Sequence, residues 1–133
     1  MPYFFEFDST HRILRCRLEG RIADEELTEY YRDLEKYSLQ QDPLGGILDM
    51  SAITSLDVSP NTIRELAKSP PAMPNPARPR VLIATSPPVF GIARMFEMQG
   101  QETRPNLHVV RSEKEALAIL GVTEAKFDPI RLK

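Results

Sequence analysis

The sequence has a single cysteine and no long apolar run. Cys16 alone cannot form an intramolecular disulfide. It shares a predicted strand face with Leu14 and Leu18, so we interpret it as a small buried hydrophobe and not as a reactive or metal-binding thiol. The apolar stretch at residues 3–5 meets acidic residues at once, which excludes a secretion signal or a membrane span there. We therefore expect a soluble, cytoplasmic protein.

An excess of charge of either sign is also missing. Lys and Arg total 17 against 19 Asp and Glu, for a net charge of -2, and no basic run could follow a phosphate backbone. The glycines are scattered, and the pair at residues 45–46 precedes a predicted strand, so no phosphate loop supports a nucleotide cofactor. His11 and His108 have no neighbours at metal-ligand spacing. We expect no nucleic acid, metal or cofactor.

Periodicity predicts a hairpin followed by alternating helices and strands. Residues 3–7 and 12–18 have strand patterns, and in the second strand Arg15 and Arg17 are expected to point outward. A helix is expected from Asp24, its predicted N-cap, to about Leu39. The apolar runs at residues 45–51 and 80–85 are typical of central strands covered on both faces. Further helices are expected from Pro60, over 89–99 and after Ser112, with a last strand at 106–110.

This order, ββαβαβαβα, predicts an α/β fold with a single, mostly parallel sheet, an N-terminal antiparallel hairpin strand and about four helices. Residues 1–121 form one predicted domain. The tail, 122–133, has Phe127 and Ile130 as anchors and could equally be frayed or docked. The proline-rich residues 68–79 predict a stiff surface loop.

Several runs resemble a known family. "GILDMSAITSLDVSP" is similar to the third strand and following turn of STAS (anti-sigma-factor antagonist, SpoIIAA-like) domains, and "RMFEMQGQ" with "VVRSEKEALAILG" is similar to their third helix, last strand and closing helix. The resemblance extends from Phe4 to Gly121. The run "FGIARMFEM" resembles a stand-alone bacterial subgroup related in topology to the CRAL-TRIO lipid-transfer fold. The resemblance implies a small regulatory or apolar-ligand-binding protein without catalysis.

The family's phosphorylation switch is not carried over. In switchable members a partner kinase phosphorylates the first serine of Asp-Ser-Ser-Gly. Here Asp57 matches the aspartate, Val58 occupies the acceptor position, Ser59 matches the second serine and Pro60 replaces the glycine. Ser followed by Pro is also a helix-start pattern, so we interpret Ser59 as an N-cap, with phosphorylation as the alternative. Asp49, predicted to end its strand, is interpreted as structural, although ligands often bind at such strand ends.

The helix predicted over residues 89–99 has more apolar residues than its core-facing stripe requires. Val89, Ile92, Ala93 and Phe96 form its core stripe, whereas four other side chains project away from that stripe: Phe90, Arg94, Met95 and Met98. Methionine recurs on adaptable binding surfaces, so a protein partner, a second copy of the chain in a homodimer or an acyl chain could cover them. Alternatively, the proline-rich loop or the tail folds over this helix.

Two functions follow. The first is a non-enzymatic interaction module of STAS type, which engages a protein through the helix after Asp57 and also the helix after Pro88. The second is a carrier or sensor of an apolar small molecule such as a lipid, bound in a cleft between helix and sheet near residues 90–98. The candidate binding residues are Asp57, Ser59, Phe90, Arg94, Met95 and Met98. An enzyme is disfavoured because no nucleophile, base and orienting group can be assembled. A deep pocket lined by Phe and Met would favour the carrier, and a shallow patch rimmed by charge would favour the module.

Overall fold

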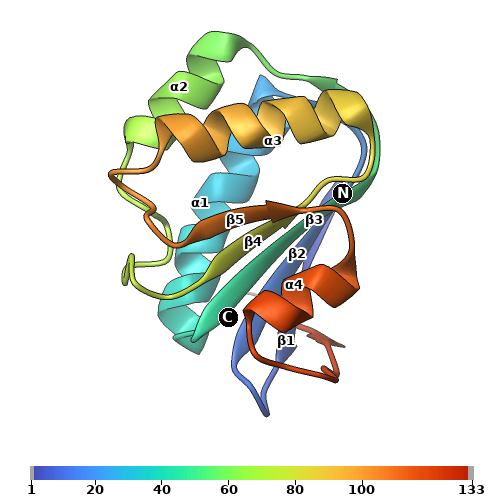
Figure 1. Cartoon of the computed structure of the whole chain (residues 1–133), viewed down its shortest axis with the longest axis vertical. Coiled ribbons are helices and arrows are strands. Elements are labelled where there is room, and N and C mark those ends of the chain that lie inside the picture. Colours follow the sequence, from blue (N-terminus) through green and yellow to red (C-terminus); the bar gives the residue numbers. More distant parts are fainter. Residues whose placement is uncertain (1, 132–133) are drawn as a thin grey trace.

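The computed structural model describes residues 2–131 and confirms the predicted α/β fold (Figure 1). In chain order the elements are β1 (Tyr3–Asp8), β2 (Ile13–Ala23), α1 (Asp24–Gln41), β3 (Gly45–Asp57), α2 (Pro60–Lys68), β4 (Arg80–Ile83), α3 (Pro87–Gln99), β5 (Leu107–Val110), α4 (Glu113–Ile119) and β6 (Asp128–Pro129). They build one sheet with the strand order β5-β4-β3-β2-β1-β6.

Chain direction explains how the helices are distributed over the sheet. Strands β2 to β5 are parallel and follow one another across the sheet, while β1 is antiparallel to β2. Right-handed crossovers that all proceed in one direction place α1, α2 and α3 on the same face. In Figure 1 α1 lies behind the sheet and α4 in front of it. The sheet is therefore covered on both faces: α1, α2 and α3 lie on one face, and α4 lies on the other.

Each face has its own core. Under α1 the rings of Tyr3, Phe5, Tyr30 and Tyr37 pack together, with the Phe5 and Tyr37 centroids 4.2 Å apart. Cys16 belongs to this core and is 1% exposed, as predicted, and burial raises the pKa of its thiol. The core under α4 is smaller and aliphatic, and its buried members are Ile13, Ile47, Val81, Ile83, Val110, Ala116 and Val122.

Two strands are longer than the sequence predicts. β2 continues past Leu18 and β3 continues past Ser51, because their ends pair with each other as far as Ala23 opposite Asp57. The prediction that Asp49 ends its strand is therefore wrong, since it lies inside β3.

Helix α1 also starts differently from the prediction. Its N-cap is Ala23, whose N–H donates to the Glu26 carboxylate at 2.8 Å, and Asp24 is the first helical residue. The N-cap predicted at Asp24 is therefore displaced by one position. The predicted caps of α2 and α4 are confirmed: Ser59 accepts from the Thr62 N–H and Ser112 accepts from the Glu115 N–H, each at 3.2 Å.

The tail is docked, and it changes the environment of Arg15. Phe127 lies against the Arg15 guanidinium, with 3.9 Å from Cζ to the ring centroid, and β6 pairs with β1. Arg15 is only 6% exposed, which corrects the outward orientation predicted from alternation. The physical reason is that α4 and the tail cover this face and supply partners: Glu6 lies 3.0 Å from Arg15, and Glu113 is also bonded to it.

The loop between α2 and β4 is more than a surface connection. Its Ala72 and Met73 are each 5% exposed and face the interior. The Arg80 guanidinium donates to loop carbonyls, including those of Asn75 at 2.9 Å and Met73, which fixes the path of the loop. Within residues 2–131, no helix is both long and apolar enough to cross a bilayer.

Candidate functional site

The region around Ser59 is a network of caps. The Ser59 hydroxyl accepts from the Thr62 N–H and donates to Thr62 Oγ1 at 2.9 Å, so both of its roles are taken. The Ser59 N–H donates to Asp24 Oδ1 at 2.9 Å, and this hydrogen bond lowers the pKa of Asp24. Asp57 is exposed and forms an ion pair with Arg21 at 2.8 Å. The structure thus brings Asp57 and Ser59 together at the paired starts of α1 and α2.

An open polar hollow lies at this place, and we call it the acidic hollow. Its lining residues are Arg21, Ala23, Asp24, Glu25, Glu26, Asp57, Val58, Ser59 and Pro60. Four carboxylates and one guanidinium make its charge negative. A phosphate on Ser59 would be placed beside the Asp24 carboxylate, and like charges at that spacing repel.

The other predicted site residues lie on α3 and do not join this hollow. Met98 is 63% exposed and Met95 is partly buried. Arg94 pairs with Glu97 one turn along the helix. Phe90 packs against the larger core, which corrects the prediction that it projects away from the core stripe. Arg111 covers it, with its Cζ 4.1 Å from the ring centroid. Phe127 packs on Arg15 at the opposite face of the sheet, so it does not cover the methionines.

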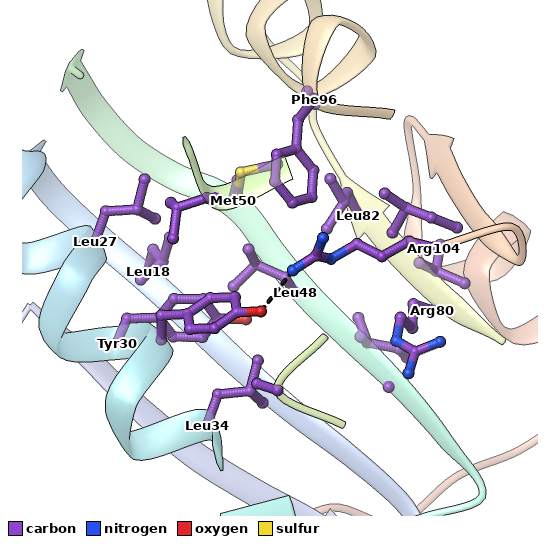
Figure 2. Close-up of a pocket in the computed structure, with 18 of the residues that line it drawn as sticks. Leu18, Leu27, Tyr30, Leu34, Leu48, Met50, Arg80, Leu82, Phe96 and Arg104 are labelled. Carbon is purple, nitrogen blue, oxygen red and sulfur yellow. Dashed lines mark hydrogen bonds between the residues drawn. The ribbon is translucent and has the colours of Figure 1, made fainter. Parts of the chain in front are cut away.

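The inner side of α3 faces a cavity of about 130 Å³, which lies between helix and sheet near residues 90–98 (Figure 2). Its wall is almost entirely apolar, and it lies between α1, α3 and the central strands. Among the side chains that line it are Leu27, Tyr31 and Leu34 from α1, Leu48 and Met50 from β3, Leu82 from β4, Ile92 and Phe96 from α3, and Met73 from the proline-rich loop. Leu48 and Leu82 line this cavity and are only partly buried, although helices cover both faces of the two central strands as predicted.

Two arginines complete the wall of this cavity. Arg104 is 5% exposed and Arg80 is 9% exposed. Burial, and then the positive charge of Arg104, lower the pKa of Arg80 to about 10. Figure 2 shows the Arg104 guanidinium between Phe96 and Leu48, hydrogen-bonded to a tyrosine hydroxyl, which is that of Tyr31. Positive charge is therefore concentrated in an otherwise apolar space.

A second charged cluster lies on the α4 face of the sheet. Arg17 Nε lies 3.4 Å from Asp49 Oδ2 and 3.8 Å from Glu6, which also binds Arg15. Asp49 Oδ1 accepts from the N–H and the hydroxyl of Ser51, at 2.9 and 2.6 Å. Its charge is balanced by neighbours, which fits the structural interpretation of Asp49. Within residues 2–131 no group of three or more His, Cys, Asp or Glu side chains is placed to hold a metal ion.

Comparison with known proteins identifies the fold class. No family model and no curated protein matches the sequence. Among solved structures, the chain is similar to the anti-sigma factor antagonist SpoIIAA in its unphosphorylated form, with a TM-score of 0.60 and 16% identity over 91% of this chain and 99% of that one. The chain thus has a SpoIIAA-like fold, as the sequence motifs indicated.

Sequence reasoning missed Arg80 and Arg104 for a physical reason. Arg104 follows α3 in a turn before a proline, and Arg80 opens a strand, so local pattern predicts an exposed position for both. Arg104 is buried by a segment distant in sequence, since its guanidinium lies against the carbonyls of Ala67 and Ser69, each at 3.1 Å. Arg80 is held by carbonyls of the preceding loop, whose folded path has no helix or strand pattern. The sequence held one signal of their burial: Arg80 begins β4 and Arg104 lies three residues before β5, and both strands are otherwise largely apolar.

Proposed function

We propose that the chain is a non-enzymatic regulatory module that binds another protein through the acidic hollow at the starts of α1 and α2. The observation that carries this proposal is the gathering of Asp24, Glu25, Glu26 and Asp57 around one capped turn. Their negative charge would complement a basic patch on the partner and steer its approach. The likeness to an anti-sigma factor antagonist supports a regulatory role. Binding would take place in the cytoplasm, where the sequence predicts the protein to be.

Two observations support a role without catalysis. The Ser59 hydroxyl is engaged as a helix cap, and a serine nucleophile needs an adjacent base. Burial raises the pKa of the Cys16 thiol, which keeps it protonated and inert. Neither side chain has the environment of a nucleophile.

A charge-reversal experiment tests the interaction module. Glu25→Lys combined with Asp57→Lys should abolish capture of a specific, basic-surfaced protein from an extract of the source organism. The matched control is Glu102→Lys, a reversal at an exposed position outside the hollow. Quantitative mass spectrometry of the captured proteins compares the three forms. Equal capture by all of them contradicts the proposed surface.

A second candidate function is binding of a small apolar molecule, and the cavity beneath α3 favours it. This is the alternative predicted near residues 90–98, except that the cavity uses the inner residues Ile92, Ala93 and Phe96 of the helix. Native mass spectrometry of the purified protein tests it, since retained ligand adds a discrete mass. An unliganded mass, together with no binding of added 1-hexanol, would count against this function.

A further inference from the structure

The wall of the cavity beneath α3 includes two buried cationic side chains, Arg80 and Arg104, and, in the described part of the chain, no acidic side chain. Charged side chains are almost never fully buried unless they are paired. Arg80 and Arg104 are at least nine-tenths buried, yet neither forms an ion pair with an aspartate or glutamate of residues 2–131. Neutral oxygens bind both guanidiniums without cancelling their charge. The positive charge of the two guanidiniums is therefore not balanced by any carboxylate of the described residues.

The two arginines are engaged to different degrees. Arg80 donates through Nη1 and Nη2 to four carbonyls of the preceding loop, so it is fixed as part of the wall. Arg104 donates from Nη1 to Ala67, Ser69 and Thr103 and from Nη2 to the Tyr31 hydroxyl. The Nε–H of Arg104 and the other N–H of its Nη2 have no acceptor among the described residues. Nε and Nη2 are the nitrogens of the side-on fork that binds carboxylates.

The same fork is occupied elsewhere in this chain. Arg15 uses its Nε and Nη2 to bind the Glu6 carboxylate, at 3.2 and 3.0 Å. Arg104 presents these two nitrogens without such a partner. Aromatic rings also hold its guanidinium in position, since Cζ lies 5.1 Å from the Phe96 centroid and 5.8 Å from that of Tyr31. The arginine is pre-organised for an acceptor that would have to come from outside the described chain.

We propose that the cavity beneath α3 binds a small carboxylate, with its two oxygens on the Nε–Nη2 fork of Arg104 and its apolar body against Leu48, Leu82 and Phe96. A carboxylate matches a fork with two free N–H groups better than a phosphate, which would need more donors. The positive charge of Arg80 adds to the attraction. This inference rests on the second candidate function and names its ligand class.

The size of the cavity limits the ligand. Its volume of about 130 Å³ is close to the roughly 150 Å³ of an apolar cavity that accommodates benzene. The apolar body is therefore expected to have roughly six carbon atoms, by that comparison. A short aliphatic or aromatic carboxylate fits this space, whereas the chains of a membrane lipid exceed it.

Calorimetric titration with hexanoate tests the proposal on the full-length protein, with 1-hexanol as the neutral probe of matched chain length. Hexanoate should bind about tenfold tighter than 1-hexanol or better, because a charge-assisted pair in an apolar site is involved. Arg104→Lys keeps the charge but removes the fork, so it should remove most of that difference. Arg64→Lys, at an exposed position on α2, should leave it unchanged.

The outcomes separate the two levels of the proposal. Equal affinity for hexanoate and 1-hexanol overturns the carboxylate and leaves cavity binding intact, whereas no binding of either probe overturns both. If Arg104→Lys fails to fold, NMR of the wild-type protein decides instead. Intermolecular NOEs from the hexanoate chain to the methyl groups of Leu48 and Leu82 support the site, and NOEs confined to other residues contradict it.

Discussion

The Asp24 carboxylate accepts a hydrogen bond of 2.9 Å from the backbone N–H of Ser59. One side chain in the first turn of α1 is thereby joined to the residue that caps α2, 35 positions later in the sequence. Both helices begin next to paired strand ends, since Ala23 lies opposite Asp57 in the register of β2 and β3. The two helix starts therefore form a single structural unit beside the acidic hollow.

Replacing Ser59 by alanine should lower the free energy of unfolding by about 1 kcal/mol, because the Thr62 N–H loses its acceptor. Urea denaturation followed by circular dichroism measures the change. Ser55→Ala, at an exposed position of β3, is the matched control and should change stability by less than about 0.5 kcal/mol. Binding to any partner should be largely retained. An unchanged stability with lost binding would instead make Ser59 a contact residue.

The Asp24–Ser59 hydrogen bond also predicts a pH dependence. It lowers the pKa of Asp24 below its usual 3.8, so the folded state binds fewer protons than the unfolded state in this range. The stabilisation is present above that usual value and is lost as the pH falls through the folded-state pKa. Asp24→Asn removes this titration. Urea unfolding at a series of pH values between about 5 and 2 should show a smaller loss of stability in the variant than in the wild-type protein. Parallel plots of stability against pH for the two proteins would contradict a contribution from Asp24.

The docked tail should contribute measurably to stability. Phe127→Ala removes the ring that covers Arg15 and should lower the free energy of unfolding by about 1–2 kcal/mol. Leu39→Ala is the control, since Leu39 is 69% exposed. Phe127→Leu separates the two contributions, because it keeps apolar contact and loses the interaction with the cation. A loss equal to that of the Leu39 variant would mean that the tail does not hold the α4 face together.

The outer side of α3 predicts a separation of folding from association. Met95→Glu with Met98→Glu should leave the circular dichroism spectrum unchanged, since Met98 is 63% exposed. It should abolish any self-association through this surface, because unpaired carboxylates at an apolar contact are costly. Sedimentation velocity measures the association, with Gln99→Glu as the control for added charge. A double variant that does not fold would assign the methionines to the core of the monomer.

Incubation with a kinase of the anti-sigma type and ATP should leave the protein unmodified. Val58 has no hydroxyl, and the hydroxyl of Ser59 is engaged with Thr62 and placed near the Asp24 carboxylate. Intact-protein mass spectrometry detects a phosphate directly. Phosphate on Ser59 would restore the hypothesis of a phosphorylation switch at the position after Val58.

The elements that sequence predicted well are those whose pattern is local. Ser59 followed by Pro60 specifies the start of a helix by itself, and so does Ser112 with Glu115, because the hydrogen-bonding partners are three residues apart. The ends of β2 and β3 were missed because polar residues and a glycine interrupt their apolar pattern, and pairing between the strands makes them extended. Local pattern carries no information about such a partner.

The candidate site likewise has a part that local sequence predicts and a part that only tertiary packing creates. The sequence placed Asp57 and Ser59 together, but the acidic hollow also needs the first turn of α1. A cleft between helix and sheet was predicted near residues 90–98, but the sequence assigned its ligand contacts to Phe90, Met95 and Met98, and the cavity is lined by Ile92, Ala93 and Phe96 instead. Its wall combines side chains from α1, β3 and the proline-rich loop, and it depends on tertiary packing that no single segment specifies. The burial of Arg104 is the clearest example.

The pairing of β6 with β1 determines how the sheet meets other molecules. Without residues 128 and 129, β1 would be an exposed edge with free hydrogen-bonding groups, the kind of margin that recruits strands from neighbouring chains. β6 covers it with only two residues, one charged and one a proline, which has no N–H to donate. The part of this edge at Glu6 and Phe7 is therefore closed to strands from neighbouring chains, and the short tail limits where such a strand could be added.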